Sequence, residues 1–314
     1  MKKWLKFELA VVIFALIIGF VESCGEIRAE NNSKSEIVEK AVIVPKTSLS
    51  NEFKSYWYSG NAEISSYKLE QARYGEIREG KSVLIYVTEP FVSDKQVKAD
   101  NNNANNIPVL KLNSTKKYLT GIYPYSIMNS SFYPVHDNQH VLKLTFSAQE
   151  WCGQVFAQLN NRDKFQVKSF SYFETEGDRE MELNKGLLEN EVWNRIRINP
   201  EKLPIGEIKM IPSLEYIRLS HKELKSYNAI TDLNIKEGIS TYSITYPTLE
   251  RSLEIKFKST FPYSIESWSE TFKSGFGKNA KKMTSTATKI KTIKTPYWQQ
   301  NGNNDLSLRD TLEL

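Results

Sequence analysis

Alternation of apolar and polar residues is the dominant pattern of this chain. In "VLKLTF", Leu142, Leu144 and Phe146 fall on one face of an extended segment. In "FQVKSFSYF" (165–173), apolar residues fall on both faces, which indicates a strand that is covered on both sides. Short polar turns separate extended segments between residues 107 and 188. The pattern predicts a mainly β fold of the β-rich α+β type, with a large curved antiparallel sheet or an open barrel.

One helix is expected within this β pattern. Residues 188–198 place apolar side chains at i, i+4, i+5 and i+8, and Pro200 follows. This helix should pack on the sheet, but it is too short to cover a second apolar face along its whole length. The sheet could close around a ligand space, or two sheets could form a solid sandwich. We expect the first arrangement, with a cavity of at least ~300 Å³.

Four further segments are predicted to be extended. Residues 57–74 and 82–91 are predicted as the strands of a hairpin, joined through the Gly-bounded connector "GEIREGK". Residues 205–221 are expected to be extended as well. The Lys- and Thr-rich run at 278–295 is typical of a guarded edge strand, and its lysines could instead meet anionic glycan or lipid head groups. The similarity between "YPYSI" (123–127) and "FPYSI" (261–265) leaves open whether the domain has two β halves.

The N-terminus has the pattern of an export signal. Three lysines precede an apolar run of 13 residues at 9–21, which is shorter than the ~20 residues that cross a bilayer. "VESC" then resembles a bacterial lipobox, with Cys24 as the lipid attachment site. An uncleaved short anchor and ordinary cleavage after Ala29 are the alternatives. The shortness of the apolar run favours the lipoprotein signal peptide, 1–23.

The expected domain organisation follows from that signal. Residues 24–52 read as a polar tether, 53–298 as the β-rich domain and 299–314 as a loose tail. The partner of acylated Cys24 would be the lipid bilayer of a bacterial envelope membrane, the outer membrane rather than the inner. A lipid, a glycan or a protein of the envelope could be a further partner. The net charge of +5 gives no argument for nucleic acid.

Candidate catalytic groups are few. Glu174 and Glu176 share a face near a Gly turn, and Glu150 is a further carboxylate. His136 and His140 have the i, i+4 spacing of a helical zinc pair, but "HDNQH" reads as a turn between strands. These residues are the only candidates if the chain is an enzyme. We expect neither a metal site nor a cofactor. A solvated hairpin tip explains the carboxylates without a bound ion.

Cys152 is the second of the two cysteines in the chain. The sequence "WCG" invites comparison with redox sites, but Val155 stands where that chemistry needs a second cysteine, two residues beyond Gly153. We therefore expect Cys152 to be a buried, inert residue within a strand.

The segments "YWYSGNAEISSYKLEQARYGEIREGKSVLIYVTEPF", "SAQEWCGQVFAQLNN" and "SYFETEGD" resemble an uncharacterised family of Bacteroidota lipoproteins, over residues 53–300. Some of its members carry the label septum formation inhibitor Maf. True Maf proteins are cytoplasmic nucleotide pyrophosphatases with an S-x-S-P-R-R-like loop, which this sequence lacks. The label is therefore treated as a misnomer. At the level of fold alone, the chain is similar to the open β-barrels of the carriers LolA and LolB.

Together these patterns lead to an expected function. We expect a membrane-anchored lipoprotein of the cell envelope with a non-enzymatic binding or structural role, holding an amphipathic ligand in a β concavity. The alternative is a hydrolase of envelope glycan or peptide that uses a carboxylate pair.

Overall fold

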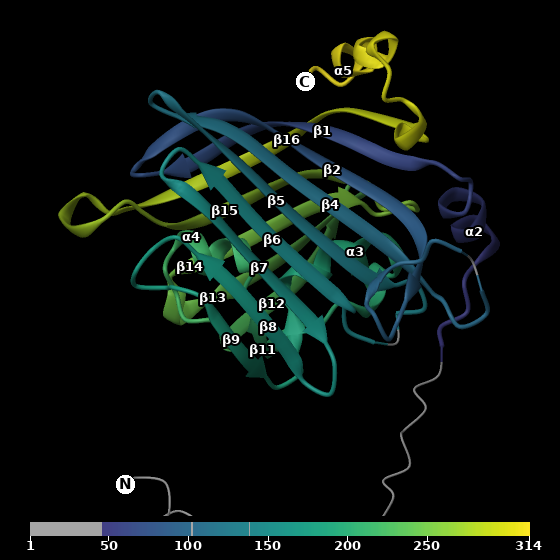
Figure 1. Ribbon diagram of the computed structural model, residues 1–314, viewed down its shortest axis with the longest axis horizontal. Coiled ribbons are helices and arrows are strands. Elements are labelled where there is room, and N and C mark those ends of the chain that lie inside the picture. The colour runs from purple at the N-terminus through teal and green to yellow at the C-terminus, as the bar shows by residue number, and fades with distance from the viewer. Residues whose placement is uncertain (1–45, 102, 138) are drawn as a thin grey trace, which may run out of the picture. The chain divides into compact units, whose positions relative to one another are not determined.

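A single curved sheet of 16 strands dominates the computed structural model, which describes residues 46–101, 103–137 and 139–314. Its strand order is β10-β11-β12-β13-β14-β15-β16-β1-β2-β4-β5-β6-β7-β8-β9, and β3 pairs with β2. The pairings are antiparallel except for β10 with β11, which are parallel. The sheet is not closed, and it curves so that its two arms face each other (Figure 1). The predicted mainly β fold with a curved sheet is confirmed.

The first arm and the centre of the sheet contain β1 (Ala62–Arg73), β2 (Glu76–Val92), β3 (Val97–Lys98), β4 (Ile107–Thr120), β5 (Tyr123–Pro134), β6 (Lys143–Glu150), β7 (Gly153–Asn161), β8 (Phe165–Ser171) and β9 (Arg179–Leu183). The other arm contains β10 (Leu187–Leu188), β11 (Gly206–Ile211), β12 (Tyr227–Lys236), β13 (Ile239–Tyr246), β14 (Arg251–Lys258), β15 (Ile265–Ser274) and β16 (Lys281–Thr295). The α-helices are α2 (Asn51–Trp57), α3 (Glu189–Ile198), α4 (Leu214–Leu219) and α5 (Ser307–Thr311), and the 3-10 turns are η1 (Pro200–Lys202), η2 (Pro247–Leu249), η3 (Gly277–Asn279), η4 (Tyr297–Gln299) and η5 (Asn303–Leu306). None of the helices in the described residues has the length and hydropathy needed to cross a bilayer.

Helix α3 lies on the concave side of the sheet, between the arms (Figure 1). The Asn194 side chain donates to the carbonyl of Leu110 on β4 at 2.7 Å, and Trp193 meets Trp268 of β15 edge-to-face. Its contacts with strands of both arms bury the helix on several faces. The predicted helix at 188–198 is confirmed, and it occupies much of the space that a central cavity would need.

The first hairpin turns earlier than expected. Tyr74 and Gly75 form the turn between β1 and β2, with φ values of 56° and 77°. Glycine adopts such left-handed conformations without steric cost. After Gly75, the rest of the connector "GEIREGK" (76–81) therefore belongs to β2 rather than to a loop. Trp57, the first residue of the first predicted strand, lies in α2, and β1 begins only at Ala62. The predicted position of the turn and the predicted start of the first strand are therefore wrong.

The two-sided burial predicted for "FQVKSFSYF" is wrong. Phe165 and Val167 are buried on the concave face, whereas Phe170 is 48% exposed and Tyr172 is 71% exposed. The outer aromatic face of this arm is therefore in contact with solvent.

The C-terminal third also departs from expectation. Residues 205–221 contain α4 as well as β11, and Ser213 caps that helix through its side-chain oxygen, which accepts from Tyr216 N. Strand β16 pairs with β15 and β1, so the Lys- and Thr-rich run at 278–295 is not an edge strand. Residues 299–314, expected to be a loose tail, contain η5 and α5, and Leu312 is buried.

Candidate ligand site

A cavity of about 630 Å³ lies beneath the end of the first arm. Strands β6 to β9 form one wall, and α4 with the residues that follow it forms the other. Its apolar lining comprises Phe146, Val167, Met181, Leu183, Leu214 and Ile217. The size and the apolar lining lie within the range of small-molecule binding sites.

The mouth of this cavity is polar and centres on Glu176. Its carboxylate lies 2.7 Å from Nε of Arg218, 2.8 Å from Nδ1 of His221, and accepts from the Ser171 hydroxyl at 3.1 Å. Arg218 also lies over the ring of Phe173 at 4.7 Å. Burial lowers the pKa of Arg218 while the charge of Glu176 opposes that shift. The arrangement holds a fixed ion pair at the entrance to an apolar space.

The three candidate carboxylates occupy different surroundings. Glu176 lines the mouth of the cavity, and Glu174 is exposed nearby. Glu150, at the end of β6, accepts from the backbone N–H of Cys152 at 2.7 Å and lines an adjacent pocket of about 120 Å³. Each of the two pockets therefore receives one of the candidate carboxylates.

The two histidines of "HDNQH" serve separate partners. Nδ1 of His136 lies 2.9 Å from the carbonyl oxygen of Thr47, and Nδ1 of His140 lies 3.0 Å from Glu191 on α3. Both contacts tie the β5–β6 connection to neighbouring segments. Within the described part of the chain, no three His, Cys, Asp or Glu side chains gather in a way that could hold a metal ion.

Of the two predictions about cysteines, the structure tests only the one about Cys152. Cys24 lies outside the described residues, so its lipidation stays a prediction. Cys152 is exposed in the turn between β6 and β7, so the expectation of a buried strand residue is wrong. The hydrogen bond and the charge of Glu150 raise the pKa of the Cys152 thiol. A raised pKa lowers the thiolate fraction, which is the reactive form.

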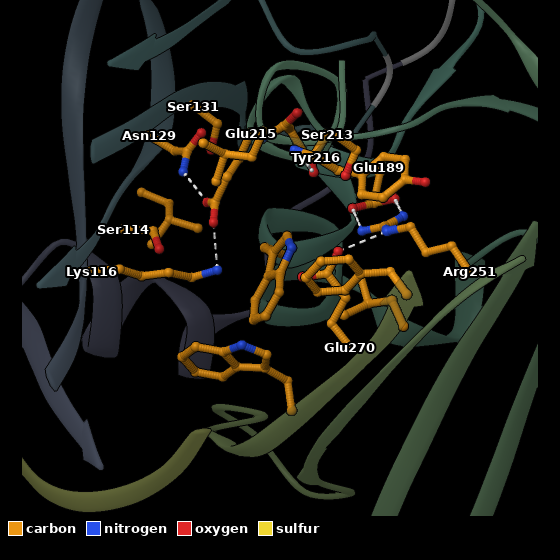
Figure 2. Close-up of a pocket in the computed structure, with 18 of the residues that line it drawn as sticks. Ser114, Lys116, Asn129, Ser131, Glu189, Ser213, Glu215, Tyr216, Arg251 and Glu270 are labelled. Carbon is orange, nitrogen blue, oxygen red and sulfur yellow. Dashed lines mark hydrogen bonds and ion pairs between the residues drawn. The ribbon is translucent and has the colours of Figure 1, made fainter. Parts of the chain in front are cut away.

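A third, smaller pocket lies deeper in the concave side, with a volume of about 80 Å³ (Figure 2). On one side, Lys116 of β4 donates to Glu215 of α4 at 2.7 Å, and Asn129 of β5 donates to the same carboxylate at 2.8 Å. Figure 2 shows the Lys116 and Asn129 side chains pointing toward the Glu215 carboxylate. They attach the short helix α4 to the centre of the sheet.

The opposite side of this pocket holds Arg251 of β14. Its guanidinium donates to Glu189 of α3 and to Glu270 of β15, each at 2.7 Å. Burial alone would lower the pKa of Arg251, but the two carboxylates outweigh burial and raise it well above its usual range. The pocket has room for only a few waters. We read it as a polar core that joins α3 to the second arm.

Comparisons with known proteins add little to this geometry. No family model matches the chain, and no curated protein matches it. Among solved structures, a porin-like protein from Bacteroides uniformis ATCC 8492 is similar over 73% of this chain and 95% of that chain, at 8% identity and a TM-score of 0.19. A TM-score that low carries no argument. The resemblance to the lipoprotein family and the Maf label gain no support from these comparisons.

The sequence reading missed the wall formed by α4. The signal was present, because Ser213 precedes Leu214 and Ile217 at i, i+3 spacing. The prediction missed it because the helix has only six residues, too few to show a helical period, although Pro212 separates it from β11.

Proposed function

We propose that the chain is a binding protein without enzymatic activity that holds an amphipathic ligand in the cavity between β6–β9 and α4. The observation that carries this proposal is the pairing of a large apolar lining with a charged mouth. An aliphatic chain in that lining would gain ~0.8 kcal/mol for each buried methylene group. A polar head group would remain at the mouth, beside Arg218, His221 and the exposed Lys222.

The alternative, hydrolysis by a carboxylate pair, has less support. A glycosidase needs two carboxyl groups that face one substrate bond, at ~5 to ~9 Å from each other. Here Glu176 already forms an ion pair with Arg218 and contacts Nδ1 of His221, while Glu150 lines the adjacent pocket. We therefore favour binding over hydrolysis.

We propose further that the protein is exported and anchored in a bacterial envelope membrane, the outer membrane rather than the inner. The support is the sequence of the first 24 residues, with cleavage before Cys24 and acylation of its thiol. Mass spectrometry of the mature protein checks this. Retention of residues 1–23, or the absence of lipid mass on Cys24, would disprove it.

Ligand binding can be tested by filling the cavity. Ala157 of β7 lines it, so Ala157→Phe places a ring in the ligand space. We expect the unmodified protein to bind dansyl-undecanoic acid saturably, with enhanced dansyl emission, and the variant to bind at least tenfold more weakly. The matched control is Gln166→Phe, because Gln166 is exposed and lies on the adjacent strand β8. Equal affinity of the two variants, both folded by circular dichroism, would refute the assignment.

A further inference from the structure

One end of the curved sheet gathers a set of hairpin tips, which we name the hairpin rim. The antiparallel registers place these connections at the same end of their strands, the left-hand end in Figure 1. They are the connections β1–β2 (74–75), β4–β5 (121–122), β6–β7 (151–152), β8–β9 (172–178) and β15–β16 (275–280). The cavity mouth lies at this rim too, since Glu176 belongs to the β8–β9 connection.

Large apolar side chains project from these tips. Ile122 is 82% exposed, Trp151 67% and Phe276 61%, and Tyr74 and Tyr172 are also exposed. At the opposite end of the sheet, the β7–β8 tip "NNRD" and the β12–β13 tip "KEG" are polar. Burying such side chains removes apolar surface from water, and aromatic rings favour the interface between lipid and water. The rim therefore differs from an ordinary solvated loop cluster.

Positive charge accompanies the apolar tips at the β15–β16 hairpin. Residues 271–295 contain seven lysines and neither Asp nor Glu. Phe276 lies at the tip, between the exposed Lys273 and Lys278, and the exposed Lys281 and Lys282 follow at the start of β16. An apolar tip flanked by unopposed lysines is complementary to a surface that is apolar inside and anionic outside.

We propose that the hairpin rim docks on a bilayer surface rich in anionic phospholipid. The apolar tips enter the head-group region, and the lysines of the β15–β16 hairpin contact lipid phosphates. Each lysine close to such a surface strengthens binding about fivefold. Docking does not require a ligand in the cavity, but it turns the cavity mouth toward the bilayer.

The test uses the exposed Cys152, which lies beside Trp151 at the rim. The full chain carrying Cys24→Ala is labelled on Cys152 with the environment-sensitive dye NBD. Vesicles of phosphatidylcholine with 30% phosphatidylglycerol should raise and blue-shift the NBD emission, and phosphatidylcholine alone should do so far less. Because the dye reports only the rim, attachment of the chain through its apolar N-terminal run would leave the emission unchanged.

Variants then separate the rim from the rest of the surface. Phe276→Ser combined with Lys278→Gln, Lys281→Gln and Lys282→Gln should weaken the response to vesicles at least tenfold. The matched control is Ile235→Ser with Lys236→Gln, two exposed positions at the opposite end of the sheet. Three outcomes would overturn the proposal: no NBD response to anionic vesicles, equal responses of the two variants, or an equal response to heparin, which would assign the lysines to an anionic glycan.

Discussion

Replacing Arg197 with methionine should destabilise the fold strongly. Arg197 of α3 is 1% exposed, and its terminal nitrogens donate to both carboxylate oxygens of Glu63 on β1 at 2.7 Å. Its Nε donates to the carbonyl of Pro262 at 2.8 Å, and its guanidinium lies over the rings of Trp57 and Tyr86. Methionine retains much of the side-chain volume but removes the charge and all of these donors.

The expected loss is about 3–5 kcal/mol of unfolding free energy, because a buried carboxylate is left without its partner. The double variant Arg197→Met with Glu63→Gln removes both charges. It should recover about half of the loss or more, since replacing a whole buried pair by neutral groups is often close to neutral. The recovery separates the electrostatic part of the effect from lost packing.

The pH dependence gives a second measure of the same pair. Burial alone would raise the pKa of Glu63, but Arg197 outweighs burial and holds that pKa below its usual range. Stability from this group is therefore present above the unfolded-state pKa and is lost as the pH falls through the folded-state pKa. In Arg197→Met the raising effect of burial is opposed only by the hydrogen bond from Tyr56 and the charge of Lys289, so the pKa of Glu63 should rise above its value in the unmodified protein. The variant's deficit should be smaller at pH 5 than at pH 7.5.

The assay is urea unfolding followed by tryptophan fluorescence and extrapolated linearly to water. In both variants the unfolding free energy should fall with urea concentration as steeply as in the unmodified protein. An unchanged slope shows that the native fold is retained. A loss below about 1 kcal/mol for Arg197→Met would refute the reasoning. So would a deficit that Glu63→Gln does not reduce.

Two other changes have clear expectations. Gly80→Ala should cost about 1–3 kcal/mol of unfolding free energy in the same assay, because a Cβ on Gly80 would lie 2.3 Å from the carbonyl oxygen of Lys117. The control is Gly186→Ala, which should cost far less because a Cβ there meets no atom within 4 Å. Equal losses would show that the β2–β4 contact adapts freely. Cys152 should react with a thiol reagent in the native protein, and Glu150→Gln should speed that reaction at pH 7.5 by lowering the thiol pKa. Reaction only after unfolding, or no acceleration, would contradict the exposed position and the role given to Glu150.

The pattern of residues predicted the sheet because alternation is local. "VLKLTF" places Leu144 and Phe146 on the concave face as expected, and both are buried. The turn at Tyr74 and Gly75 was misplaced because "GEIREGK" is rich in charge, and alternation cannot distinguish an exposed strand end from a loop. In the structure, residues 76–81 of that segment all pair with β1.

The contents of the concave side could not be read from the sequence. Glu189, Glu191 and Arg197 are charged residues of α3 that lie outside its apolar pattern, yet all three are buried. They are buried because partners such as Glu63 and Arg251 come from strands far along the chain. Burial of charge depends on such distant pairs, so neither periodicity nor composition reports it. The cavity was expected in general terms, but α4, which closes it, was not.

The position of β1 in the sheet has a consequence for how the chain folds. In sheet order, β10 to β16 and β1 to β9 are two runs in which nearly every strand pairs with its neighbour in sequence. Within the described sheet, strands of the two runs pair with each other only where Ala62 and its neighbours on β1 pair with β16 near Thr295, almost the whole length of the described chain apart. Local hairpins form early, and closing so large a loop is slow. We expect each meander to assemble by itself and the β1–β16 ladder to join them last, so that weakening this ladder speeds unfolding and leaves the refolding of each meander unchanged.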